Sequence, residues 1–325
     1  MANTAKKNKK VSVIIPTYNR SAVLRECVDS VLRSDYSPIG VVIVDNASTD
    51  DTESACALRY GADTDGRHVQ YIRLPENRMA AGGRNAGISH AKGDYLLFLD
   101  NDNIIEPEMI GHLVRVFETH PDIGLVGALS IQADRGCIWT LGADYNFLTS
   151  MPINLHEGER PETVHMQVLY PTRYSPNAVM VTRTAMERAK VFDPFYKAMY
   201  EEADFGFRIT GAGFKGVICS SARTLHLGAV GSGQVSALRR LGIETPERAY
   251  LFARNRSVFM RRFAPWHGQF VFFLLFIHMF TLYYCWTAIR HARTDIAYAY
   301  FRGAFRGLLI AFFHMPPLPQ DSVST

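Results

Sequence analysis

Short apolar runs rich in β-branched residues alternate with helical patterns over the first 120 residues of this chain. The runs that indicate strands occupy residues 11–15, 41–44, 69–73 and 95–99, and the helical patterns occupy residues 21–33, 50–60, about 83–91 and 107–117. Strands that alternate with helices pack as a mainly parallel sheet with helices on both faces. The pattern therefore predicts an α/β fold.

Polar side chains follow three of the predicted strands, at the point where each strand ends. Residues 16–20 read PTYNR, residues 45–48 read DNAS, and residues 100–103 read DNDN. In parallel sheets, ligands bind at the carboxyl ends of the strands, so these segments predict one site. Asp100 and Asp102 can share a hard cation. The alternative for DNDN is a plain turn, because Asp and Asn hydrogen-bond their own backbone.

Two glycine patterns resemble phosphate-binding loops only in their letters. Residues 211–216 read GAGFKG, but they follow a predicted helix and precede a strand at 217–219, the reverse of a dinucleotide fingerprint. We interpret them as a helix C-cap and a turn. Residues 82–85 lack the spacing and the Lys-Ser/Thr ending of a P-loop, which argues against an ATPase.

Four separated segments of the chain carry a family pattern in a fixed order. They read VSVIIPTYNR, VVIVDNASTDDT, ENRMAAGGRNAGISHAKGDYLLFLDNDN and VFDPFYKAMYEEADFGFRITGAGFKG, with TLHLG further on. This arrangement resembles glycosyltransferase family 2, inverting sugar transferases with the GT-A fold, over about residues 10–260. The chain is most similar to the rhamnosyltransferase-like, single-sugar subgroup. The Q-x-x-R-W motif of processive synthases is absent, since Ala237 stands three residues after Gln234.

The resemblance implies roles for residues at the strand ends. Pro16, Tyr18 and Asp45 match positions that hold the base and ribose of a nucleotide sugar. Arg84 matches a basic residue near the diphosphate, and a planar guanidinium suits a phosphate because it can donate two hydrogen bonds. Asp100, the first carboxylate of the D-x-D motif, is expected to face the ribose or the metal.

A divalent cation, Mg²⁺ or Mn²⁺, is the implied cofactor. Asp100 and Asp102 match the D-x-D ligands, and His226 matches a histidine that completes the metal shell in related enzymes. The alternative for His226 is a hydrogen-bonded core histidine. We assign the amides of Asn101 and Asn103 to the turn itself.

The general base is expected in the segment Glu201-Glu-Ala-Asp204, which matches an E-D-x-D pattern at a helix start. Glu202 stands where the family usually has Asp; it is one methylene longer, with a similar ordinary pKa. We predict Glu202 as the base and Asp204 as the second candidate. Asp204 could instead pair with Arg208, four residues further along the helix.

Composition limits the other classes of function. The chain has 325 residues, is 47% hydrophobic, and carries a net charge of +4 without a basic stripe, so we expect no nucleic-acid partner. Its five cysteines are scattered, odd in number and without C-x-x-C. They indicate neither a disulfide framework nor a zinc site, and therefore a reducing compartment.

Two C-terminal segments predict membrane association. Residues 270–289 carry no formal charge over a length that can cross a bilayer, and arginines flank both ends. In residues 296–313, Arg302 and Arg306 share a helical face, as in a helix lying at the membrane surface. A buried helix pair of a soluble protein is the alternative. The basic start and the short apolar run after it do not form a signal peptide, so the catalytic part is expected in the cytoplasm.

These observations predict four regions. They are a basic tail (1–10), a nucleotide-sugar-binding half (11–103), an acceptor-side half of the same catalytic domain (104–232), and a C-terminal membrane-associated helical region (233–325).

The predicted function is metal-dependent inverting transfer of a hexosyl or deoxyhexosyl group. The donor is a nucleotide-diphosphate sugar, and the acceptor is a hydroxyl of a glycan or lipid-linked acceptor at the cytoplasmic face of the cell membrane. One alternative is a sugar nucleotidyltransferase, although PTYNR replaces the Gly-rich, Arg-containing loop expected after its first strand. The other is a catalytically inactive nucleotide-binding protein. The nucleotide, sugar, acceptor, oligomeric state and spanning or interfacial placement of the helices stay open.

Overall fold

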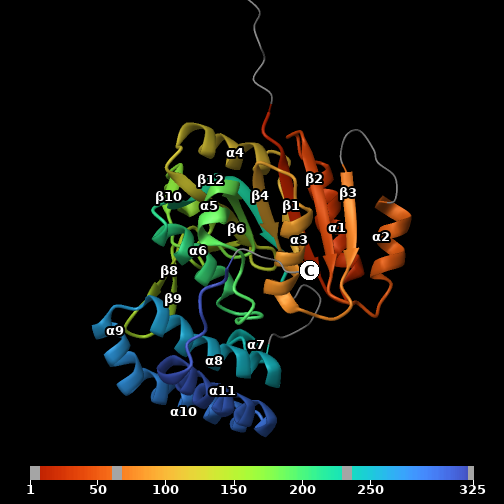
Figure 1. Ribbon diagram of the computed structural model, residues 1–325. Coiled ribbons are helices and arrows are strands. Elements are labelled where there is room, and N and C mark those ends of the chain that lie inside the picture. Colours follow the sequence, from red (N-terminus) through yellow and green to blue (C-terminus); the bar gives the residue numbers. More distant parts are fainter. Residues whose placement is uncertain (1–7, 61–67, 229–235, 321–325) are drawn as a thin grey trace, which may run out of the picture.

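The computed structural model describes residues 8–60, 68–228 and 236–320. Most of the predicted basic tail and the predicted boundary between residues 232 and 233 lie outside this part of the chain. Within it, one ten-stranded sheet runs through both predicted halves of the catalytic domain (Figure 1).

The order of the main path is β10-β12-β6-β11-β4-β1-β2-β3, with β5 beside β12 and β7 beside β6. The bounds are β1 Val11–Thr17, β2 Ile39–Asp45, β3 His68–Arg73, β4 Tyr95–Leu99, β5 Asn103–Ile105, β6 Ile123–Gln132, β7 Cys137–Thr140, β10 Leu169–Pro171, β11 Ala178–Thr182 and β12 Lys215–His226; a separate hairpin joins β8 Ala143–Asn146 to β9 Met151–Asn154. β1 pairs in parallel with β2 and β4, β2 with β3, and β12 with β6. The predicted mainly parallel sheet is confirmed, and β11 enters it antiparallel between β4 and β6.

Helices cover both faces of the sheet, as predicted. The sheet has a hydrophobic core on each face, and alternate residues of β1 point into different cores. Val13 and Ile15 pack with one set of helices, and Ile14 packs with the other. Strands buried on both faces are apolar almost throughout, which is why β1 has no simple alternation of polar and apolar residues. The first face carries α1 Ser21–Leu32, α2 Thr52–Tyr60 and α4 Met109–Thr119, and the second carries α3 Met79–His90, α5 Arg183–Ala189 and α6 Glu201–Gly211.

Two predicted helix starts differ from the structure. α3 begins at Met79 rather than near residue 83, and α4 begins at Met109 rather than at Pro107. α3 lies close against the sheet, where a Cβ on Gly87 would collide with Ile14. The interpretation of residues 211–216 is confirmed: α6 ends at Gly211, and Gly213 has a φ of +94° before β12 begins.

The C-terminal helices form a layer below the sheet domain in Figure 1. They are α7 Ala237–Arg240, α8 Pro246–Phe263, α9 Trp266–Val271, a π-helical turn η2 Phe272–Phe276, α10 Ile277–Arg290 and α11 Thr294–Phe313; a short 3₁₀ turn, η1, spans Pro161–Thr163. α11 packs closely on α8, because Gly303 and Gly307 face the carbonyl oxygens of Tyr250 and Arg254.

Two helices of the described residues are long and apolar enough to cross a membrane by length and composition, Trp266–Arg290 and Thr294–Phe313. Only 17% of the apolar window is buried in the first helix and 44% in the second. The first helix is therefore not a buried core helix. Arg302 and Arg306 are both exposed, as their spacing predicted.

Candidate active site

The three polar strand ends meet at one edge of the sheet. Thr17 at the end of β1 pairs in register with Asp45 at the end of β2. The Asn101 amide, just after β4, donates to the Thr17 hydroxyl at 2.8 Å. The backbone N–H of Asn46 donates to the Thr17 carbonyl at 2.9 Å. The predicted convergence of these segments is confirmed.

The three residues predicted to bind the nucleoside differ in accessibility. Asp45 has no exposed side-chain surface; its carboxylate accepts hydrogen bonds from the Tyr71 hydroxyl at 2.5 Å and from Arg73 at 3.0 Å. Tyr18 is 44% exposed, and Pro16 is half-buried. Tyr18 therefore offers an open aromatic ring at this edge, whereas Asp45 orders the side chains beside it.

A buried guanidinium joins the β4 strand end to the start of α6. Arg84, on α3, has a side chain only 3% exposed, and its Nη2 donates to Asp100 at 2.7 Å and to Glu202 at 2.6 Å. Its Nη1 donates to Glu201 at 3.0 Å. The first D-x-D carboxylate and the predicted base thus both pair with the guanidinium of Arg84. Arg84, predicted at the diphosphate, lies among these carboxylates in the structure.

Glu202 is the more accessible of the two neighbouring glutamates, with 20% of its side chain exposed against 7% for Glu201. Burial raises the pKa of Glu202 to about 8; the Arg84 guanidinium opposes this shift, and the charges of Asp100 and Glu201 add to it. Burial also raises the pKa of Glu201, again against Arg84. A carboxyl group with a pKa near neutral pH is suited to general base catalysis.

The second D-x-D carboxylate faces the predicted histidine. Asp102 Oδ1 lies 3.5 Å from His226 Nε2, and Asp102 Oδ2 accepts a hydrogen bond from Arg20 at 2.8 Å. The backbone N–H of Leu227 donates to the Asp102 carbonyl at 2.8 Å, which fixes β12 against this loop. The His226 ring packs on Trp139, with ring centroids 4.4 Å apart.

The donor set at Asp102 and His226 fits a divalent cation. A carboxylate oxygen and an imidazole nitrogen are ordinary ligands of Mn²⁺, and Mg²⁺ sites often use one or two carboxylates together with substrate phosphates. Asp100, the other predicted ligand, has its Oδ1 bonded to Arg84, and its role toward a metal stays a prediction. Among the described residues, no group of three or more His, Cys, Asp or Glu side chains is placed to hold a metal.

Asp204, the second candidate base, lies away from this cluster of carboxylates. Its side chain has no exposed surface, and its two oxygens pair with Arg208 at 2.7 Å and with Arg262 at 2.6 Å. The pairing with Arg208 is the alternative that the helical spacing offered. The amides of Asn101 and Asn103 make internal hydrogen bonds, to Thr17 and to the Asp100 carbonyl.

Several residues of the site were missed by sequence reasoning. Arg20 closes the PTYNR segment, and Glu201 directly precedes Glu202, so position alone could have indicated both. Asn177 joins two parts of the site, because its carbonyl accepts from the Asp100 N–H at 2.8 Å and its own N–H donates to Glu202 at 3.4 Å. Trp139 and Asn177 carry no sequence signal that separates them from other loop and strand residues.

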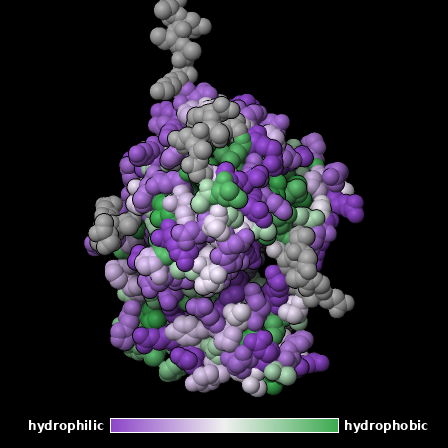
Figure 2. Space-filling view, turned by 90° about the vertical axis from the view of Figure 1, so that its right-hand side faces the viewer, coloured by the Kyte–Doolittle hydropathy of each residue, from purple (hydrophilic) through white to green (hydrophobic). Residues whose placement is uncertain are grey.

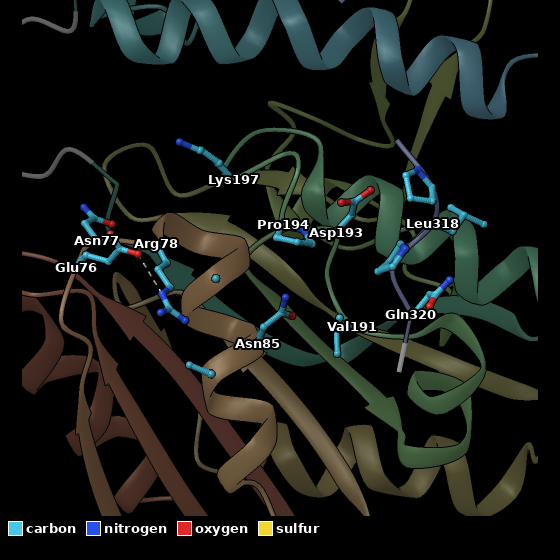
Figure 3. A pocket seen from close by; sticks show the side chains of 14 residues that line it. Glu76, Asn77, Arg78, Asn85, Val191, Asp193, Pro194, Lys197, Leu318 and Gln320 are labelled. Carbon is cyan, nitrogen blue, oxygen red and sulfur yellow. Dashed lines mark ion pairs between the residues drawn. The ribbon is translucent and has the colours of Figure 1, made fainter. Parts of the chain in front are cut away.

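A cavity of about 630 Å³ opens beside the site (Figure 3). It lies between the N-terminal end of α3, the segment 191–197 and the C-terminal segment 317–320. The lining side of α3 carries Gly82, Asn85 and Ala86, and the Asn85 amide donates to the Phe192 carbonyl at 2.8 Å. None of the predicted site residues lines this cavity.

The fold and the site define a class of protein. A mainly parallel sheet with a D-x-D strand end, facing carboxylates at a helix start, has the architecture of a GT-A glycosyltransferase. Residues 12–173 match the model of glycosyl transferase family 2, and this domain places the chain in that family. The predicted family and fold class are confirmed, and the rhamnosyltransferase-like subgroup stays a prediction.

Comparison with known proteins gives partial matches. The chain is 35% identical to the glycosyltransferase GlyG of Streptococcus pneumoniae serotype 4 over 100 residues, 31% of this chain and 32% of GlyG. It is 32% identical to GlyA of the same organism over 139 residues, 42% of this chain and 19% of GlyA. The chain thus spans about a third or less of the length of these relatives.

The fold resembles a solved structure over most of its length. It is the structure of the mannosyltransferase PcManGT from Pyrobaculum calidifontis in complex with GDP-Man and Mn2+. The TM-score is 0.53 at 15% identity, and the match covers 93% of this chain and 88% of that one. At this identity, the likeness concerns the fold.

Proposed function

We propose that this protein is a metal-dependent inverting glycosyltransferase that moves a sugar from a nucleotide-diphosphate donor to a hydroxyl of a glycan or lipid-linked acceptor. The observation that carries the proposal is the Arg84 bridge between Asp100 and Glu202. It brings the D-x-D strand end and a carboxyl group of raised pKa into one cluster. The neighbouring fold, solved with GDP-Man and Mn2+, supports a nucleotide-sugar donor and a divalent cation.

Glu202 is the proposed base. Its carboxylate takes the proton of the acceptor hydroxyl as the hydroxyl oxygen attacks C1 of the donor sugar, an effect worth about 10² to 10⁴ in rate. Asp204 is proposed as a structural ion-pair residue, because Arg208 and Arg262 occupy both of its oxygens. Tyr18 and Pro16 are proposed to contact the nucleoside, with Asp45 ordering Tyr71 and Arg73 next to them.

Asp102 and His226 are proposed to hold the cation, either Mg²⁺ or Mn²⁺. When bound, the cation neutralises charge that the nucleoside diphosphate gains as it leaves. Arg20 donates to Asp102 Oδ2, the carboxylate oxygen that does not face His226, and Trp139 packs against the His226 ring. Both contacts orient the proposed ligands before any donor arrives.

An assay of purified protein with nucleotide sugars, with and without Mn²⁺, tests the proposed function. We expect transfer to a hydroxyl acceptor, release of nucleoside diphosphate, and loss of turnover after chelation. A sugar nucleotidyltransferase would instead form the nucleotide sugar from a sugar phosphate and an added nucleoside triphosphate, and release pyrophosphate. A donor that raises the melting temperature without any turnover would indicate a binding protein. Metal-independent transfer would contradict the role given to Asp102.

We also propose that the C-terminal layer docks on a membrane. α9 to α11 expose large apolar side chains, including Trp266 (79% exposed), Leu282 (72%) and Phe313 (74%). Apolar and hydrophilic side chains lie side by side over the lower part of the face in Figure 2. Because α11 packs tightly along α8, an interfacial position is favoured over a span that leaves α8. The cytoplasmic face stays a prediction.

Vesicle flotation of the full chain tests the membrane proposal. We expect binding to vesicles of phosphatidylglycerol and phosphatidylcholine, because Arg302 and Arg306 face outward and each basic residue near an anionic surface contributes about 1 kcal/mol, roughly fivefold in affinity. Leu282→Asp should abolish flotation. The matched control is Leu58→Asp. Leu58 is 92% exposed, but it lies on α2 in the sheet domain, outside the C-terminal layer. Equal loss in both variants, or flotation unchanged by Leu282→Asp, would contradict the proposal.

A further inference from the structure

The segment between α5 and α6 has an unusual backbone immediately before the proposed base. Lys197, Met199 and Tyr200 have φ values of 61°, 66° and 73°, although none of them is glycine. Non-glycine residues persist in this left-handed region only where surrounding contacts hold them. Tyr200 directly precedes Glu201 and Glu202, so the conformation of this segment sets where α6 begins.

Asn255 on α8 holds this segment. Its side chain has no exposed surface, and its amide nitrogen lies 2.9 Å from each of the carbonyl oxygens of Tyr196, Ala198 and Met199, so that its two N–H groups serve three acceptors and one N–H is shared between two of them. Its Oδ1 accepts a hydrogen bond from Arg254 Nε at 2.9 Å, which fixes the orientation of the amide. One buried side chain therefore contacts three carbonyl oxygens inside the strained segment, between residues 196 and 199.

Arg262, two turns further along α8, ties the two ends of the same segment together. Its Nη1 donates to Asp193 at 2.8 Å and to Asp204 at 2.6 Å, and its side chain is 8% exposed. Asp193 lies before the left-handed residues, and Asp204 lies in the first turn of α6. Asp193 also faces the cavity of Figure 3, so this ion pair stands at the cavity wall.

Arg256 links the segment to the C-terminal layer. It is 1% exposed, its Nε donates to the Tyr200 hydroxyl at 3.2 Å, and its Nη1 donates to the Tyr300 hydroxyl of α11 at 3.4 Å. Its guanidinium lies over the rings of Phe252 and Phe280, 4.4 and 4.5 Å from their centroids. A buried cation is costly unless it is compensated, and aromatic faces supply part of that compensation.

From these contacts we infer that Asn255, Arg256 and Arg262 of α8 are positioning residues for the base: they hold residues 193–200 in the one conformation that directs Glu202 toward the acceptor hydroxyl. The inference rests on the proposed function of Glu202. These three residues touch no reacting atom, and they act through the segment that ends at Tyr200, the N-cap of α6, and through Asp204 in the first turn of α6. Figure 1 shows α8 directly below the α6 region, which is the position that such contacts require.

The effect of losing these contacts is a displaced base. A misplacement of about 1 Å at a reacting group can cost on the order of 10² in rate. The donor is expected to bind at the strand ends of β1, β2 and β4, which α8 does not contact through any of these bonds. Loss of the positioning residues should therefore lower kcat and leave the KM for the donor unchanged.

The test compares four variants of the full chain with the wild type. Asn255→Ala and Arg262→Met should lower kcat about ten- to a hundredfold at an unchanged donor KM. Arg262→Lys keeps a cation between Asp193 and Asp204 and should retain most of kcat. The control is Leu113→Ala, a buried residue of α4 on the opposite face of the sheet, which lowers thermal stability without touching the segment.

Hydrogen exchange separates failure of this inference from failure of the proposed function. Asn255→Ala should speed amide exchange within residues 193–204, and Leu113→Ala should not; this readout needs no substrate. Unchanged exchange there, unchanged kcat in Asn255→Ala, or an equal kcat loss in Leu113→Ala would overturn the inference. If the wild type shows no transfer but the exchange difference appears, the proposed function fails while α8 is still shown to hold the segment.

Discussion

Glu202→Gln is expected to remove sugar transfer, lowering kcat by about 10² to 10⁴, while the protein still binds the nucleotide sugar. Glutamine keeps the size of the side chain and can still contact Arg84, but it cannot accept the proton of the acceptor hydroxyl. Steady-state kinetics give kcat, and isothermal titration with the donor gives its affinity.

Glu201→Gln is the matched control for this variant. Glu201 also pairs with Arg84, at 3.0 Å, but its side chain is only 7% exposed. We expect a much smaller loss of kcat from it. Wild-type turnover in Glu202→Gln, or equal losses in the two variants, would exclude Glu202 as the base.

The same assignment fixes the pH dependence. Because burial raises the pKa of Glu202 to about 8, the free enzyme holds this carboxyl mostly protonated at pH 7. A base must be deprotonated, so kcat/KM should rise about tenfold per pH unit below 8 and level off above it. The rising limb should disappear in Glu202→Gln.

Asp102→Asn is expected to raise the Mn²⁺ concentration needed for activity and to lower the maximal rate by roughly 10²-fold. The amide keeps the volume of the side chain but removes the negative charge beside His226. Metal stabilisation of a leaving group contributes several kcal/mol, and 1.36 kcal/mol corresponds to a factor of ten in rate. Activity measured as a function of Mn²⁺ concentration reports both changes.

Arg20→Gln controls for the ion pair that Asp102→Asn also breaks. The Arg20 side chain is 43% exposed and only orients the Asp102 carboxylate, whose charge stays in place in Arg20→Gln, so the Mn²⁺ requirement should rise much less than in Asp102→Asn. An unchanged Mn²⁺ dependence in Asp102→Asn would remove this residue from the proposed metal site.

Much of the fold could be predicted from the sequence, because buried parallel strands are continuous apolar runs that stop at polar residues. β1, β2 and β4 were all found in this way. The start of α3 was not, since its first turn contains Met79 with a φ of 57° and shows little apolar periodicity. β11 is a short strand whose antiparallel place in the sheet depends on partners far along the chain.

The site was predictable as a set of strand ends and only partly as a set of contacts. The strand ends converge because parallel strands share an edge, and this follows from topology alone. The partners of Arg84 do not follow in this way, since Glu201 and Glu202 lie 117 and 118 residues away in the chain. For Asp204, the pair with Arg208 was visible at a spacing of four, whereas Arg262 lies 58 residues away.

The long reach of α8 matters for anyone who wishes to prepare a shortened chain. The family match ends at residue 173, yet Glu202 and His226 lie beyond it, and Arg262 pairs with Asp204 from the last turn of α8. A fragment cut at the end of the match would lack both proposed chemical groups, and one cut before α8 would leave Asp204 with a single cation. The minimal piece expected to keep its own active centre therefore includes α8 and, because Arg256 bonds Tyr300, extends into α11, well past the end of the family match.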